Sequence, residues 1–275
     1  MKGERLNIPN LRKSAEELDR MREKSITLAH ERWPLYDADI RSFAKEFRQV
    51  IPGGEKARTE KESVRVFVDY IRTILQPEQN RHLTALEFGG PGVRIFQGFP
   101  KGFFEKTYGV CLDDTSNSIK KKPRSTHEII RGNIFHKETY SKIDAALYGD
   151  GVDLILSRMY GGLDEVTHDP IIWARVARTW YKLLHEGGLM FVQYRLSTAD
   201  RWISETEIQK DVREKLMTEW VDFIKEHFSD VLDIQLDDFA FRLYRKIGAP
   251  EELPILKDFD GTRIIEKRPE DPRPF

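Results

Sequence analysis

Apolar side chains recur at helical spacing along the first 80 residues. The segments 11–32, 36–51 and 62–75 each place apolar residues three or four positions apart, which is the spacing of one helix face. Pro34 and the run Pro52-Gly53-Gly54 separate these segments, because proline and glycine interrupt helices. The pattern therefore predicts a helical N-terminal extension over residues 1–80.

From Leu83 the pattern changes to short apolar runs of strand length. The runs lie at 83–88, 107–112, 127–132, 152–157 and 188–194. Helical segments are predicted between them, at 93–105, 170–186 and about 204–228. Such alternation is typical of a mostly parallel sheet with helices on both faces, so we predict a three-layer α/β fold.

Two further runs, at 231–236 and 239–246, depart from this alternation. Only Asp237 and Asp238 separate them, which is too short for a parallel crossover, so we expect these two strands to be antiparallel neighbours. The chain then divides into the extension 1–80, an α/β domain 81–247 and a tail 248–275. The tail is rich in proline and charge and is expected to lie extended on the surface, where a role as a lid or as an arm of a homodimer stays open.

The composition narrows the class of protein. Hydrophobic residues make up 39% and charged residues 33% of the chain, which fits a globular protein with a solvated surface. With a net charge of −1, the protein as a whole does not attract nucleic acid or an anionic membrane electrostatically.

The cysteine content and the apolar runs exclude further classes of protein. The single Cys111 excludes an intramolecular disulfide and a cysteine zinc site, and we predict no metal site. The N-terminus lacks the apolar core of a signal peptide and no run reaches membrane-spanning length, so we expect a cytoplasmic protein with no membrane partner.

One stretch is typical of a ligand-binding turn. It reads TALEFGGPGV, residues 84–93. Glu87 closes a buried apolar run, and the turn that follows consists of Gly89, Gly90, Pro91 and Gly92. Glycine adopts backbone angles that other residues avoid and lets a ligand approach the main chain closely. The stretch predicts a binding site where the first strand ends.

Five stretches, in order along the chain, resemble the class I S-adenosylmethionine-dependent methyltransferases. They are LEFGGPG at 86–92, YGVCLDD at 108–114, RGNIF at 131–135, VDLILSRMYGG at 152–162 and LLHEGGLMFVQ at 183–193. The resemblance covers about residues 84–247. It implies a Rossmann-like, mostly parallel seven-stranded sheet with an antiparallel last strand, and S-adenosylmethionine as the cofactor.

The resemblance also implies roles for particular residues. The implied cofactor-binding residues are Glu87, Gly89, Gly90, Pro91 and Gly92 around the methionine chain and ribose, Asp113 or Asp114 at the ribose hydroxyls, Asn133 and Ile134 at the adenine, and Ser157 at the end of the fourth strand. Tyr160, in the loop after that strand, is the candidate catalytic residue. Methyl transfer needs mainly alignment of the reacting groups, so Tyr160 is expected to line the pocket.

The sequence departs from the family pattern in two places. The turn reads E-x-G-G-P-G, one residue tighter than the usual acidic-x-G-x-G-x-G, and Asn133 stands where aspartate is usual. A non-catalytic binding protein of the same fold is therefore an alternative, as is an NAD-dependent oxidoreductase, which places a pyrophosphate at a similar turn. The expected function is methyl transfer to a small-molecule acceptor. The Asn/Asp-Pro-Pro-aromatic step of many DNA methyltransferases is missing after the fourth strand, which argues against a nucleic-acid partner.

Overall fold

A seven-stranded sheet in the order β3-β2-β1-β4-β5-β7-β6 forms the centre of the protein. The computed structural model describes residues 38–75, 82–112, 126–134, 136–158, 170–193, 207–237 and 240–254. The strands are β1 Thr84–Phe88, β2 Lys106–Cys111, β3 His127–Arg131, β4 Val152–Ser157, β5 Leu184–Gln193, β6 Leu232–Leu236 and β7 Ala240–Arg245. Strands β1 to β5 run parallel, whereas β7 is antiparallel to both β5 and β6. The predicted fold class is confirmed.

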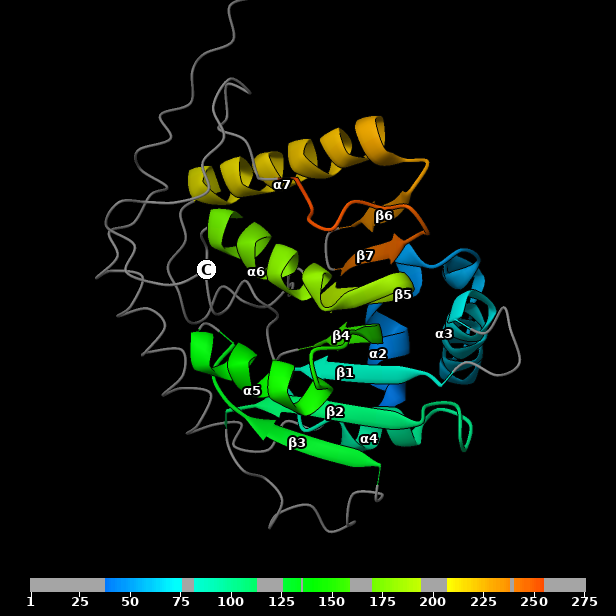
Figure 1. Ribbon diagram of the computed structural model, residues 1–275. Coiled ribbons are helices and arrows are strands. Elements are labelled where there is room, and N and C mark those ends of the chain that lie inside the picture. Colours follow the sequence, from blue (N-terminus) through cyan, green and yellow to red (C-terminus); the bar gives the residue numbers. More distant parts are fainter. Residues whose placement is uncertain are drawn as a thin grey trace, which may run out of the picture.

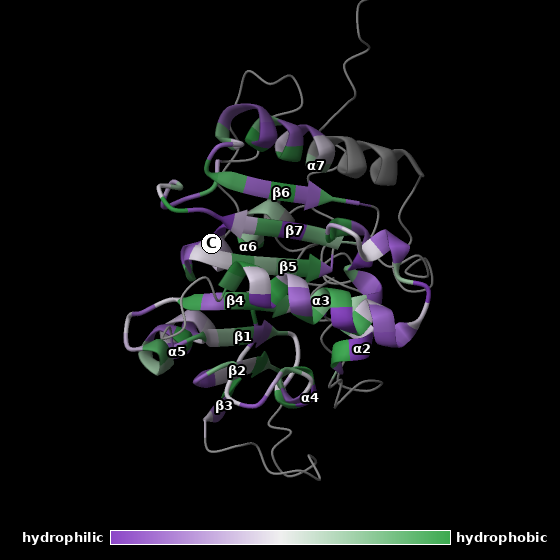
Figure 2. Cartoon of the chain, turned by 90° about the vertical axis from the view of Figure 1, so that its right-hand side faces the viewer, coloured by the Kyte–Doolittle hydropathy of each residue, from purple (hydrophilic) through white to green (hydrophobic). Residues whose placement is uncertain are grey.

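Helices cover both faces of the sheet (Figure 1). One layer contains α2 Ile40–Glu46, α3 Glu60–Leu75 and α4 Val93–Gln97, and the 3₁₀ turns Arg48–Val50 and Gly54–Lys56 join α2 to α3. The other layer contains α5 Lys137–Leu147, α6 Pro170–Lys182 and α7 Glu207–Phe228. Figure 2 shows hydrophilic residues along β6, which is an edge strand. In the parts of the chain that the structure describes, every helix is too short or too polar to cross a membrane.

Alternating strand residues fill two separate cores. In β4, where every side chain is buried, Ile155 packs with the α5–α7 layer, whereas Leu154 and Leu156 pack with the α2–α4 layer. Burial on both faces is what a central parallel strand requires.

The described part of the predicted helical extension belongs to one of the three layers. Phe47 of the α2 C-cap and Phe67 of α3 contact Phe191 of β5, with ring centroids 5.3 and 5.4 Å apart. All three side chains are at most 1% exposed. Helices α2 and α3 therefore share a continuous apolar core with the sheet.

Two predicted helix ends were wrong. Helix α4 ends at Gln97, not at residue 105, because Gly98 caps it and Pro100 interrupts helices. The aromatic residues that follow pack on one another: Phe103 stacks on Phe99 at 5.6 Å, and Phe104 lies edge-on to both. Strand β5 begins at Leu184, inside the segment predicted as helix, and the register of β4 with β5 shifts after Leu184. A β-bulge of this kind leaves no repeating pattern of apolar residues in the sequence, so the sequence did not predict it.

The tail begins with a packed segment. Ala249 and Leu253 are buried among residues of the α6–α7 layer. The Arg178 Nε of α6 donates to the Leu253 carbonyl at 2.9 Å, and the Trp220 Nε1 of α7 donates to the Pro254 carbonyl at 2.9 Å. The first residues of the tail are therefore fixed by hydrogen bonds from two helices.

A buried arginine connects the α3 layer to the antiparallel hairpin. Arg242 of β7 is 2% exposed and donates to both carboxylate oxygens of Asp233 on β6, at 2.8 and 2.9 Å. It also donates to the Tyr70 hydroxyl of α3. Burial raises the pKa of Tyr70, so its hydroxyl stays neutral at physiological pH. The ion pair with Asp233 compensates the buried positive charge of Arg242, which would be costly to bury without a partner.

We expect Asp233→Ala to destabilise the protein more than Arg242→Met does. The first substitution leaves a buried guanidinium without its carboxylate and should lower the free energy of unfolding by about 2–3 kcal/mol. The second removes the buried charge, leaves Asp233 partly exposed to water, and should cost about 1 kcal/mol. Urea unfolding measures both values, and a larger loss for Arg242→Met would contradict this explanation.

Candidate functional site

The candidate site lies where the parallel strands end, at the point where the strand order reverses. Strands β1 and β4 are neighbours there, with Phe88 in register with Ser157. The chain continues from β1 to β2 on one side of this point and from β4 to β5 on the other. The two connections therefore diverge, and a crevice for ligands forms outside the strand ends. Glu87 and Ser157 are each 1% exposed at this edge.

The predicted glycine turn needs its glycines for geometric reasons. Gly89 and Gly92 have φ angles of +87° and +75°, in the left-handed region. A Cβ on Gly90 would lie 2.7–2.8 Å from the Glu87 carboxylate atoms. The acid therefore lies beneath the turn, and only glycine at position 90 leaves room for it.

The turn packs directly on β2. A Cβ on Gly109 would lie 2.1 Å from the carbonyl carbon and oxygen of Pro91. His127 of β3 holds the same carbonyl: its Nε2 lies 2.7 Å from the Pro91 oxygen, and its Nδ1 lies 2.8 Å from the Thr107 hydroxyl. Since the carbonyl can only accept, Nε2 carries the proton and donates. Burial lowers the pKa of His127, which keeps the ring neutral at physiological pH.

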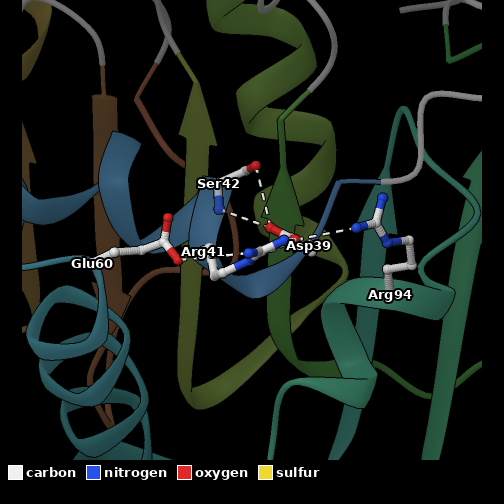
Figure 3. Close-up of polar contacts among 5 residues, drawn as sticks. All are labelled: Asp39, Arg41, Ser42, Glu60 and Arg94. Carbon is white, nitrogen blue, oxygen red and sulfur yellow. Dashed lines mark hydrogen bonds and ion pairs between the residues drawn. The ribbon is translucent and has the colours of Figure 1, made fainter.

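Helix α2 is anchored to α4, the helix that follows the turn (Figure 3). Asp39 caps α2 by accepting from the Ser42 N–H at 3.1 Å, and its other oxygen accepts from Arg41 Nε at 2.9 Å and Arg94 Nη2 at 3.2 Å. These donors hold the pKa of Asp39 below its usual value. The carboxylate therefore ties α2 to the residue two positions after Gly92.

The other end of α2 meets the end of β4. Arg158, directly after β4, donates to Glu46 at 3.2 Å, and both side chains are about 15% exposed. Burial raises the pKa of Glu46, and the negative charge of Asp237 raises it further. Helix α2, about 10 Å long, thus runs along the ligand edge from α4 to β4.

The structure brings together only part of the predicted site. Glu87, the turn and Ser157 lie on neighbouring strands, whereas Asn133 and Ile134 follow β3, two strands away from β1. Ile134 is 7% exposed and packs in the α5–α7 core. Tyr160, Asp113 and Asp114 lie outside the described residues.

Sequence reasoning missed two residues that shape the turn, Gly109 and His127. A glycine inside an apolar strand marks a place where another backbone approaches closely, and the run TYGVCL carries that signal. His127 carries no comparable signal, because its contact with Pro91 depends on the strand order. Among the described residues, no group of three or more histidine, cysteine or acidic side chains could hold a metal ion.

No family model and no curated protein sequence matches the chain. Solved structures do match. MycE, a methyltransferase of the mycinamycin biosynthetic pathway solved with Mg, SAH and mycinamycin VI, has a TM-score of 0.41 at 15% identity, over 67% of this chain and 47% of that chain. A putative O-methyltransferase from Klebsiella pneumoniae has a TM-score of 0.42 at 10% identity, over 87% and 94% of the two chains. The plantazolicin methyltransferase BpumL, in complex with a substrate analogue and SAH, has a TM-score of 0.42 at 10% identity, over 84% and 98%.

The present chain spans about half the length of the MycE chains. Its own sheet, in the order 3-2-1-4-5-7-6 with an antiparallel β7, is the Rossmann-like sheet that the sequence resemblance implied. The fold is therefore that of the class I methyltransferases.

We expect Gly109→Ala to displace the turn and to lower the free energy of unfolding by about 3 kcal/mol, because the added methyl group would meet backbone atoms that have no room to move. Gly102→Ala is the matched control. Its φ is also positive, at +79°, but a Cβ there meets nothing within 4 Å, so it should cost about 1 kcal/mol. Thermal unfolding separates the two, and equal losses would refute the close packing.

The lowered pKa of His127 predicts a pH dependence of stability. Below its ordinary pKa of 6.5, histidine binds a proton in the unfolded chain before it does so in the native protein. The contribution of His127 is therefore complete above that pH and declines below it. As pH falls from about 7.5 to about 5.5, wild type should lose more stability than His127→Gln, as measured by urea unfolding at each pH. Parallel losses would contradict a neutral, buried His127.

Proposed function

We propose that the protein transfers a methyl group from S-adenosylmethionine to a small-molecule acceptor. The observation that carries this proposal is the acid beneath the glycine turn: Glu87 is 1% exposed at the strand-order reversal and is covered by Gly90. A carboxylate in this place is a counter-charge for the ammonium group of a bound amino acid. The sequence resemblance points to the same ligand.

Two features favour this cofactor over a dinucleotide. The helix after the turn, α4, has only five residues, so it offers little dipole to hold a pyrophosphate. Strand β7 enters antiparallel between β5 and β6, whereas a dinucleotide-binding sheet continues in parallel. Both features support a ligand that carries no pyrophosphate.

The residues around the turn fit the proposed cofactor. When bound, S-adenosylmethionine supplies a methyl group on a sulfonium centre, which reacts with an aligned nucleophile. Glu87 would attract the ammonium group, and the backbone of Gly89 to Gly92 would allow the methionine chain to approach. His127 would keep the turn in place through Pro91. The ribose role of Asp113 or Asp114, the adenine role of Asn133 and Ile134, the contact of Ser157 and the pocket role of Tyr160 belong to the same proposal.

A small molecule is the proposed acceptor because the chain has little to attract a polyanion. Its 45 lysines and arginines are balanced by 46 aspartates and glutamates. Nucleic-acid binding depends on a surplus of positive charge facing the phosphates.

Calorimetry on the full chain tests the proposal. SAH and S-adenosylmethionine should bind at one site per chain, and NAD should not bind. Glu87→Gln keeps the shape of the side chain but removes its charge, so SAH affinity should fall by about 10-fold to 100-fold, the loss of a charge-assisted hydrogen bond.

Glu226→Gln is the matched control, because Glu226 is exposed on α7, and it should leave SAH affinity unchanged. Circular dichroism checks that each variant is folded. If folded wild type binds neither sulfur ligand, the proposed function is wrong. If Glu87→Gln binds as tightly as wild type, the role given to Glu87 is wrong.

A further inference from the structure

Gln193, the last residue of β5, carries a buried amide that the sheet does not use. Its side chain is 1% exposed, and neither Oε1 nor Nε2 has a hydrogen-bond partner among the residues that the structure describes. Burying an amide without partners is unfavourable, and buried polar groups in folded proteins are nearly always paired. A group of this kind at a ligand edge is a candidate for binding a ligand.

The sheet fixes where this amide lies. Ser157 of β4 is in register with Val192 of β5, so the next residues on the two strands, Arg158 and Gln193, are neighbours. Side chains alternate along a strand, which puts Gln193 on the face of Phe191, toward α2 and α3. Arg158 reaches Glu46 of α2 on that same face. Gln193 therefore lies at the carboxyl edge, beside the ion pair that holds the end of α2.

This position is on the far side of the strand-order reversal from the turn. The glycine turn packs toward β2, whereas Gln193 lies beyond β4, on β5. A cofactor and a methyl acceptor that meet over β1 and β4 would then approach from opposite sides, one from the glycine turn and the other from β5. With the cofactor at the turn, the β4–β5 side is left for the methyl acceptor.

The charges around Gln193 favour a neutral polar group. Arg158 is paired with Glu46, and Asp237 lies close enough to raise the pKa of Glu46. Asp237 also accepts from the N–H of Ala240, the residue in register with Gln193 on β7. Lys45 and Arg48 also act on Glu46, but both are exposed to solvent. On the less exposed side one guanidinium therefore faces two carboxylates, which disfavours a carboxylate or phosphate ligand. A neutral ligand avoids this cost.

We propose that Gln193 binds the methyl acceptor and that the acceptor presents a carboxamide-like edge, with a hydrogen-bond donor beside an acceptor atom. This inference rests on the proposed function. The Gln193 Nε2 donates to the carbonyl oxygen of the ligand, and its Oε1 accepts from the neighbouring N–H. Primary carboxamides and lactams share this edge. The pair of hydrogen bonds both selects the acceptor and orients it toward the cofactor.

Two variants, Gln193→Met and Gln193→Leu, test the inference, with Gln235→Met as the control, since Gln235 is exposed on the edge strand β6. Replacing an unused buried amide by an apolar side chain should raise Tm by about 2–4 °C. The control should leave Tm unchanged. If both Gln193 variants lower Tm, the amide has a structural role and the inference is overturned.

Ligand-observed NMR with SAH present supplies the second measurement. The probes are benzamide, which carries the full edge, and acetophenone, which lacks the donor. Wild type and the control should prefer benzamide by about fivefold or more, and both Gln193 variants should lose that preference. A preference that is missing in wild type, or that survives in the Gln193 variants, overturns the inference.

SAH binding keeps the two proposals apart. Wild type that fails to bind SAH contradicts the proposed function, whatever the probes do. Wild type that binds SAH but shows no dependence on Gln193 leaves the proposed function standing and overturns only the acceptor assignment.

Discussion

The packing of the glycine turn onto β2 is the contact on which the ligand edge depends. Pro91 lies against Gly109 so closely that no side chain fits between them, and His127 holds the Pro91 carbonyl from the next strand. With the turn fixed from this side, Gly90 covers Glu87. The position of the acid is therefore set by the turn and by the contacts that β2 and β3 make with it.

Helix α2 provides the second boundary of that edge. Its N-terminus is tied to α4 through Asp39 and Arg94, and its C-terminus reaches β4 through Glu46 and Arg158. Beneath it, Phe47 packs on the sheet against Phe191. An apolar core thus holds the helix in place, while charged pairs at its two ends fix its direction across the strand ends.

The strands and the antiparallel close of the sheet could be predicted from the sequence, because they depend on local signals. The Rossmann-like arrangement of the whole sheet was implied by the family resemblance. Strand-length apolar runs, a two-residue gap at Asp237 and Asp238, and the run of glycines after Glu87 are all visible without a structure. The contact of Gly109 with Pro91 was not predicted, because it joins positions that meet only once β1 and β2 pair. Among the described residues the Gln193 amide has no hydrogen-bond partner. This depends on which residues surround it in the fold, so no sequence pattern predicts it.

The length of α4 and the start of β5 were predicted wrongly for a related reason. Phe99, Phe103 and Phe104 have helical spacing but are held by stacking on one another, and tertiary packing overrides such a pattern. At Leu184 the strand begins before the bulge, because Leu184 pairs with Val152 of β4, a contact that the local sequence does not express. Errors of this kind fall at element ends, where local preference is weakest.

The place of β7 in the sheet has a consequence for how the chain is made. Strand β5 pairs with β4 on one side and with β7 on the other, yet residues 240–245 are synthesised about 50 positions after β5. During synthesis the backbone groups on one edge of β5 are therefore unpaired until β7 has left the ribosome. An open apolar strand edge is a template for pairing with other chains. The nascent protein is therefore open to such pairing until β7 joins the sheet.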